Sequence, residues 1–230
     1  MAIALFASRY YRLEVLTPAE LAPKQPRPPE PPEDCTEIRR AMALSARSLV
    51  SGQEKPIKIT TPLGADETAI YRAVIRQWSS NEPAVLHVSG ETFPIDATSF
   101  SDRAECGCLS GLSVESLLRA SHSFHILTPS DLPGKGIRLV QPDKQRSIVA
   151  RNDPDTTVRE ERSVNDAVEN AFANGLFSMS EIVFDKERHY ALVSYSFHCG
   201  LLCGSGALWA FEKVNGEWRK TDRECGGWIA

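Results

Sequence analysis

Apolar and polar residues alternate most regularly near the carboxyl end of the chain, through residues 191–199. A strand points successive side chains to opposite faces, so this alternation predicts a β-strand. The odd-numbered residues, from Ala191 to Cys199, are apolar and share one face. The even-numbered residues, from Leu192 to His198, share the other face and are mostly polar. The pattern therefore predicts a strand with one buried face.

Strands are also predicted on both sides of this segment, at 181–184, 207–214 and 217–220. Asn215-Gly216 separates the last two segments. A type I′ hairpin turn favours this dipeptide because both central residues need a positive φ. Strands joined by so short a connection pair as antiparallel neighbours. The last third of the chain is therefore predicted to be an antiparallel β-meander.

Upstream of this region, apolar residues recur at the three- and four-residue spacing of amphipathic helices. Helices are predicted at 35–50, from Asp66 toward Pro83, at 113–119 and from Ser163 to Asn174. Short strands are predicted at 57–59, 84–89 and 137–140, a Gly-rich loop at 96–112 and an exposed connection at 141–162. The expected fold class is α+β, with an antiparallel β-meander at the C-terminus packed with several helices.

A proline-rich segment divides the amino-terminal part of the chain. Seven of the 15 prolines lie between Pro18 and Pro32, and this composition favours an extended polyproline II spacer. We expect an N-terminal segment at 1–17, a Pro-rich linker at 18–33 and a single α+β domain at 34–230. Two interpretations of 1–17 stay open. It is the first element of a cytosolic protein, or it is the truncated end of a signal or membrane anchor that tethers the domain upstream of the linker.

Composition and charge narrow the function classes only slightly. Hydrophobic residues make up 42% and charged residues 24% of the chain, as in ordinary globular proteins. The formal net charge is -4 and the sequence has no basic stripe, so we expect no nucleic-acid partner. The sequence motifs of phosphate-binding loops and of serine hydrolases do not occur. We therefore predict no cofactor, and an enzyme is not favoured.

The six cysteines are the most distinctive candidate residues. Cys199 and Cys203 flank a Gly-rich loop, and glycines let such a loop fold back until the two Cα atoms are close enough for a disulfide. Cys199–Cys203 is therefore the candidate disulfide, with a modest stabilisation of about 2 kcal/mol in the loop-closure model. Pairing within Cys106-Gly107-Cys108 would be strained. Further disulfides stay open among the remaining cysteines: Cys35, Cys106, Cys108 and Cys225.

Reduced structural thiols, a zinc site and a catalytic thiol are the alternatives for these cysteines. The spacing of Cys199 and Cys203 fits zinc ligands, whereas Cys106 and Cys108 are too close. His198 is the nearest base for a catalytic thiol, but adjacent strand residues face opposite sides, which weakens a dyad with Cys199. A further pair, His122 and His125, has a spacing that can chelate a metal on a helix, yet no carboxylate motif accompanies it. No metal site is therefore predicted.

A longer pattern surrounds the cysteine loop. It combines Cys-Gly-x-Leu-Cys-Gly-x-Gly with flanking strands, a Gly-x-Trp turn and a closing Trp. The residues are Ser180, Phe184, Ala191, Leu192, Val193, Cys199, Gly200, Leu202, Cys203, Gly204, Gly206, Lys213, Gly216, Trp218 and Trp228. Over these positions the chain resembles an uncharacterised bacterial family with no established activity. Members of that family often look exported, so the resemblance implies a periplasmic or extracellular location, with the cytoplasm as the alternative.

The function is therefore unknown from the sequence, as are the ligand and the partner. The best-supported expectation is a non-enzymatic, exported or surface-associated binding or interaction domain. One alternative is a hydrolase-type enzyme with a Cys or Ser nucleophile in the loops at 106–113 or 199–205. A small zinc-binding protein is the other alternative.

Overall fold

The alternating segment forms half of a long hairpin in the computed structural model of the chain. β7 (Tyr190–Gly200) and β8 (Cys203–Val214) pair as antiparallel strands joined by a two-residue turn. The structure describes residues 36–41, 43, 55–79, 85–95, 106–132, 134, 136–159, 163–223 and 225–230. The predicted N-terminal segment and Pro-rich linker lie outside these residues.

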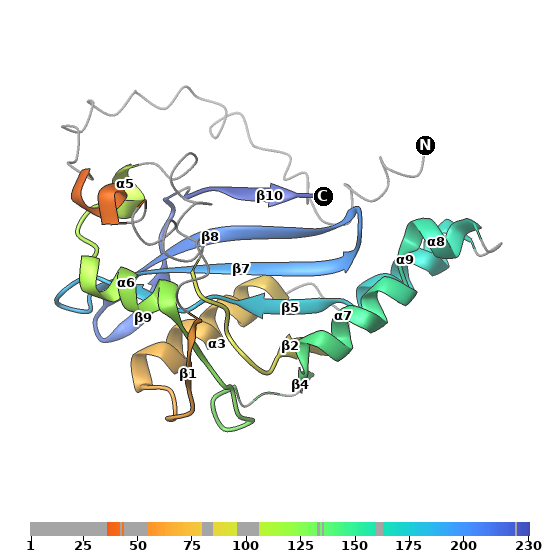
Figure 1. Cartoon of the computed structure of the whole chain (residues 1–230), viewed down its shortest axis with the longest axis horizontal. Coiled ribbons are helices and arrows are strands. Elements are labelled where there is room, and N and C mark those ends of the chain that lie inside the picture. The colour runs from red at the N-terminus through yellow and green to blue at the C-terminus, as the bar shows by residue number, and fades with distance from the viewer. Residues whose placement is uncertain are drawn as a thin grey trace. The chain divides into compact units, whose positions relative to one another are not determined.

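β7 and β8 belong to an eight-stranded sheet (Figure 1) with the order β10-β8-β7-β5-β2-β4, in which β6 also pairs with β7 and β9 with β8. The added strands are β2 (Leu86–Ser89), β4 (Ile137–Val140), β5 (Leu176–Met179), β6 (Val183–Phe184), β9 (Glu217–Lys220) and β10 (Gly227–Ile229). Pairing is antiparallel except that β2 runs parallel to both β4 and β5. A separate parallel pair joins β1 (Ile57–Ile59) to β3 (Ser123–His125). The predicted α+β class and C-terminal antiparallel strands are confirmed.

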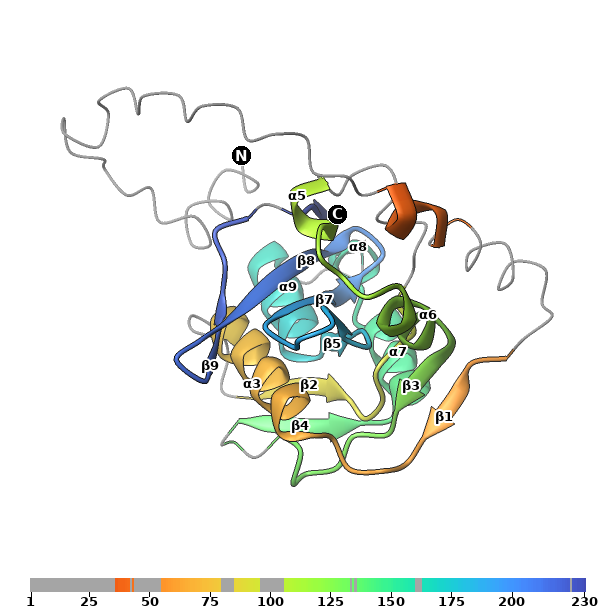
Figure 2. The same cartoon turned by 90° about the vertical axis from the view of Figure 1, so that its left-hand side faces the viewer.

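Helices cover both faces of this sheet, as Figure 2 shows. One face carries α3 (Ala65–Ser79) and α9 (Val164–Ala173), and the other carries α5 (Cys106–Leu109), α6 (Val114–His122) and α7 (Pro142–Arg151). The short helix α8 (Pro154–Arg159) follows α7. Two hydrophobic clusters result: Val193 packs in the cluster of α3 and α9, whereas its neighbour Leu192 packs in the cluster of α6. The strand alternation thus separates two cores.

Several local signals act as the sequence predicts. The Ser113 hydroxyl caps α6 by accepting a hydrogen bond from the Ser116 N–H at 3.3 Å, and Ser163 caps α9 in the same way. Asn215 and Gly216 both have positive φ, 53° and 82°, as the predicted turn requires. In the predicted helix at 35–50, residues 36–41 and 43 are helical and the others lie outside the described residues.

The predicted exposed connection at 141–162 is wrong, because α7 and α8 occupy most of it. Pro142 starts α7 at a position where its missing N–H costs nothing, and Gln145 and Val149, four residues apart, are buried. Only these two positions of α7 are fully buried, and one of them is a polar Gln, so the apolar periodicity is too weak to stand out in the sequence. α5 similarly falls within the predicted loop at 96–112.

β5 and β10 are strands that the pattern did not predict. β5 lies between β7 and β2 and is buried on both faces at Leu176, Phe177 and Met179, so it lacks polar alternation. The Gly-rich loop is also shorter than expected. β7 runs to Gly200 and β8 begins at Cys203, which leaves two turn residues.

Candidate functional site

Two disulfides hold the C-terminal part of the chain. One closes the turn end of the β7–β8 hairpin, and the other joins α5 to the segment before β10. Cys199 Sγ and Cys203 Sγ are 1.91 Å apart, with a Cα separation of 5.0 Å. Cys108 is bonded to Cys225 across 117 residues of sequence. The side chains of Cys35 and Cys106 lie outside the described residues. Two such bonds fit an oxidising environment.

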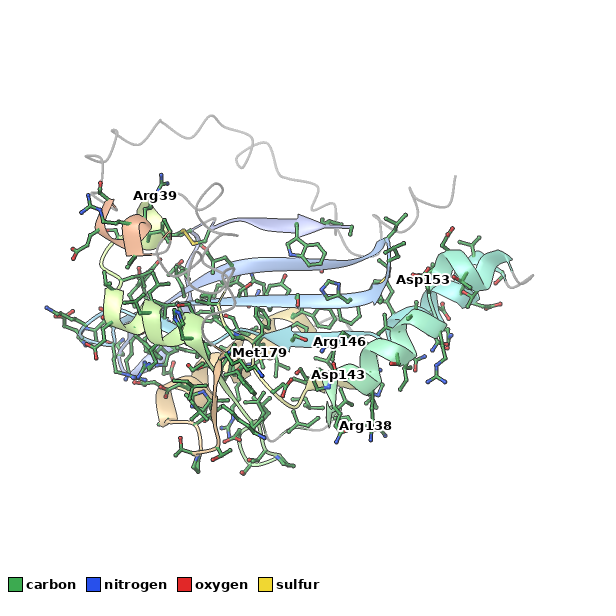
Figure 3. The ribbon with its side chains drawn as sticks, in the orientation of Figure 1. Arg39, Arg138, Asp143, Arg146, Asp153 and Met179 are labelled. Carbon is green, nitrogen blue, oxygen red and sulfur yellow. A yellow bond between two sulfur atoms is a disulfide. The ribbon has the colours of Figure 1, made fainter. Side chains whose placement is uncertain are left out.

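The glycines of the cysteine motif make room for neighbouring groups. The Trp228 indole lies against Gly204 and Gly206, and a Cβ on Gly206 would come within 2.5 Å of the indole Nε1. On the other strand, a Cβ on Gly200 would meet the Asp153 carboxylate at 2.9 Å. That carboxylate accepts a hydrogen bond of 2.5 Å from the N–H of Leu201 in the turn. Figure 3 shows Asp153 beside the turn end of the hairpin. The motif therefore serves the packing of the hairpin.

This arrangement does not supply a reactive thiol or a zinc site from the described cysteines. Cys199 is fully buried in one core, and Cys108 is buried in the other, on the opposite face of the sheet. The sulfurs of both residues are used in disulfides. The His198 side chain is exposed on the face opposite Cys199, where its ring lies 5.2 Å from that of Trp228. Partial loss of water around the ring, together with the charge of Arg146, lowers the pKa of His198.

A carboxylate–histidine pair was not predicted from the sequence. Glu181 is 6% exposed, and its carboxylate accepts a hydrogen bond from the Thr92 hydroxyl and one from the backbone N–H of His125 at 3.0 Å. The His125 Nδ1 lies 2.9 Å from Glu181 Oε2. The hydrogen bond that the His125 ring makes to the Glu181 carboxylate is the largest effect on His125 and raises its pKa. The pair connects β3 to the segment between β5 and β6.

The Glu181–His125 pair is the observation closest to a catalytic arrangement. A carboxylate that holds an imidazole in one orientation is part of many hydrolase sites. Such a site also needs a nucleophile, and among the described residues no hydroxyl or thiol is hydrogen-bonded to the His125 Nε2. His122 is not a partner, because its ring turns back to the Leu118 carbonyl oxygen. The two histidines do not share a helix: α6 ends at His122. No group of three or more possible ligands in the described parts of the chain is arranged for a metal ion.

A network of charges fixes the amino end of α3 against β8 and β9. The Asp66 Oδ1 accepts hydrogen bonds from Lys213 Nζ at 2.7 Å and from the indole Nε1 of Trp218 at 2.9 Å. Arg188 lies 3.4 Å from Asp66 and 2.6 Å from Glu67. Burial raises the pKa of Asp66, but the hydrogen bonds from these donors outweigh it and leave a lowered pKa. The helix is therefore held in a fixed position beside the hairpin.

A basic groove lies between α3 and β9, next to this network. It has a volume of about 790 Å³. The lining residues on α3 are Ala69, Arg72, Ala73, Arg76 and Gln77, and those on the β9 hairpin are Gly216, Glu217, Trp218, Arg219 and Lys220. Four of these side chains are cationic and one is a carboxylate. The chain as a whole is acidic, so the positive charge is local.

The cations of the groove are only partly neutralised. Arg72 and Arg76 are exposed and form no ion pair with a described residue. The Arg219 guanidinium lies 3.2 Å from Glu217, and both side chains are largely exposed. Lys220 Nζ lies 5.2 Å from the centre of the Trp209 ring, a contact that leaves its charge in place.

A second hollow, of about 460 Å³, lies near Cys108, and its cations are neutralised by carboxylates. Its cations are Lys213 and Arg223, and each is paired with a carboxylate: Lys213 with Asp66 at 2.7 Å and Arg223 with Glu212 at 3.6 Å. The groove between α3 and β9 is therefore the better candidate for a ligand. The sequence signal for it was the pair Arg72 and Arg76, four residues apart on one helix face.

In comparisons with known proteins, no protein-family model, no curated protein and no solved structure matches the chain. The resemblance to an uncharacterised bacterial family therefore stays a prediction. Among the described residues, no helix is both long enough and apolar enough to cross a membrane.

Proposed function

We propose that this protein is a non-enzymatic binding domain that holds an anionic ligand in the groove between α3 and β9. The observation that carries the proposal is the excess of positive charge in that groove on a chain of net charge -4. We further propose that the domain is exported or surface-associated, in the periplasm or outside the cell. The two disulfides support this location.

The chemistry of the groove favours carboxylate, phosphate or sulfate groups. A guanidinium presents several N–H donors in one plane and binds such oxyanions through two parallel hydrogen bonds. Arg72 and Arg76 have no carboxylate partner among the described residues, so an anion does not need to displace an existing ion pair. The small side chains of Ala69 and Ala73 keep the floor of the groove open. The groove is therefore suited to an anionic ligand. Its described lining contains no Ser, Thr or Cys side chain.

The experiment measures binding of a fluorescently labelled oligo-glutamate peptide by fluorescence anisotropy. We expect Arg72→Glu/Arg76→Glu to weaken binding by about tenfold or more, because each charge-assisted hydrogen bond contributes about 1.5–3 kcal/mol. The matched control is Lys144→Glu/Arg151→Glu, which makes the same charge change on the exposed face of α7. The control should bind nearly as well as the wild type.

Salt provides a second measurement on the same samples. Binding should weaken as ionic strength rises, because salt screens exposed charges. Equal losses in the groove variant and the control would show that only overall charge matters, and the proposal would then be wrong. The proposal would also be wrong if the wild-type protein bound no anion.

A further inference from the structure

We infer that the ligand of this groove is an extended acidic peptide segment that adds to the outer edge of β9 as a further strand. The inference rests on the proposed function, because it names the ligand class of the same groove. Five consecutive residues, from Gly216 to Lys220, line the groove. Side chains of a strand alternate between its two faces, so one face would contribute only every second residue. Because consecutive residues line the groove, the groove runs along the edge of the strand, where the backbone groups lie.

The hydrogen-bond register of β9 shows which backbone groups point to that edge. Val214 and Glu217 are partners at the end of the hairpin, and the Thr221 N–H donates to a β8 carbonyl oxygen at 2.9 Å. Antiparallel partners are hydrogen-bonded at every second residue, so the odd-numbered residues of β9 bond to β8. The N–H and C=O groups of Trp218 and Lys220 therefore point outward. Within the described residues β9 pairs with β8 alone, which leaves these groups for an added strand.

The spacing of the cations on the opposite wall matches a strand. Arg72 and Arg76 are four residues apart on α3, which places them about 6 Å apart along the helix axis. Alternate residues of a strand point to the same face and lie about 6.7 Å apart. Two acidic residues separated by one residue would therefore present their carboxylates to the two guanidinium groups in register. The expected ligand motif is acidic–x–acidic.

The length of the groove agrees with a short strand. The lining residues of α3 run from Ala69 to Gln77, or about 12 Å along the helix. A strand of four residues has about the same length. The proposed ligand segment is therefore about four residues long, with its acidic side chains toward α3.

A second copy of this chain does not fit the same edge. Symmetric pairing of two β9 strands would bring Arg219 and Lys220 of each copy close to the Arg72 and Arg76 of the other. Like charges would then face each other, which is unfavourable. An acidic partner has the opposite charge, and charge complementarity therefore selects it.

The test compares three peptides by fluorescence anisotropy and competition. The first alternates Glu and Val, the second has the same composition with its Glu residues adjacent, and the third repeats the first with N-methylated backbone amides. Alternation should improve the dissociation constant by about tenfold, and N-methylation should remove that gain because a methylated amide cannot donate to β9. Peptide binding should also slow hydrogen exchange at the Trp218 and Lys220 amides.

Two variants at one position separate the backbone from the charge. Lys220→Ala removes the charge and keeps the outward N–H, whereas Lys220→Pro removes both and is tolerated on an edge strand. Lys220→Pro should weaken binding of the alternating peptide more than Lys220→Ala does, and unfolding curves check that both variants are folded. Equal binding of all three peptides would overturn strand addition and leave the anion groove intact. Strand addition would likewise be overturned, with the anion groove intact, if no peptide bound but inositol hexakisphosphate did and the Arg72→Glu/Arg76→Glu variant lost that binding. Failure of every anion would overturn the proposed function as well.

Discussion

The two described disulfides should contribute very differently to stability, because they close loops of different length. Cys108 and Cys225 are 117 residues apart, whereas Cys199 and Cys203 are four apart. A crosslink removes entropy from the unfolded chain in proportion to the logarithm of the loop length. The loop-closure model gives about 5 kcal/mol for the long loop and about 2 kcal/mol for the short one.

The perturbation is a pair of alanine variants, Cys108→Ala/Cys225→Ala and Cys199→Ala/Cys203→Ala. Alanine introduces no buried hydroxyl. Cys108, Cys225 and Cys199 are at most 2% exposed and Cys203 is half-buried, so each variant also loses packing around its sulfur atoms. The long-loop variant should therefore lose roughly 3 kcal/mol more of the free energy of unfolding than the short-loop variant.

Urea denaturation followed by tryptophan fluorescence measures both free energies. The slope of the free energy against urea should rise in both variants, since a less constrained unfolded chain exposes more surface. Mass spectrometry of proteolytic fragments checks that the other described disulfide is intact in each variant. If the short-loop variant is destabilised as much as the long-loop variant, unfolded-state entropy does not set the contribution and the reasoning is refuted.

Two other predictions concern packing and pH. Gly206→Ala should cost roughly 1–3 kcal/mol in urea denaturation, because its Cβ would lie 2.5 Å from the Trp228 indole and 2.8 Å from the backbone carbonyl oxygen of Tyr195. Gly134→Ala should cost less, because its Cβ would meet only the flexible end of the Ile137 side chain, at 3.0 Å. Equal costs would contradict the packing of Trp228. Glu181 raises the pKa of His125 in the folded protein, so their pair stabilises the fold fully below the unfolded pKa of about 6.5 and loses this effect as pH rises through the raised value. The stability difference between wild type and His125→Asn in denaturation curves should therefore shrink as the pH rises above about 6.5, and a constant difference would contradict the pair.

Local signals in the sequence determined the C-terminal hairpins. The alternation in 191–199 fixes which side chains face each core, because adjacent strand residues cannot share a face. Asn215-Gly216 fixes the next turn, since few residues accept the two positive φ angles found there. Serine caps likewise marked the starts of α6 and α9. All these signals act over a few residues and do not depend on the rest of the chain.

The tertiary structure alone decided the order of the strands and the site. β5 had no alternating pattern because it is buried on both faces, a condition created by the helices that cover the two sides of the sheet. The pairing of Cys108 with Cys225 required two distant segments to meet, and the six cysteines by themselves allow many pairings.

The candidate groove has the same origin. The sequence places Arg72 and Arg76 on one face of a helix, but it does not say that the edge of β9 lies opposite them. That juxtaposition follows from the contacts of Asp66 with Lys213 and Trp218, which are about 150 residues away in sequence. Periodicity and turn chemistry are short-range properties, whereas a binding groove depends on which distant surfaces the packed core brings together.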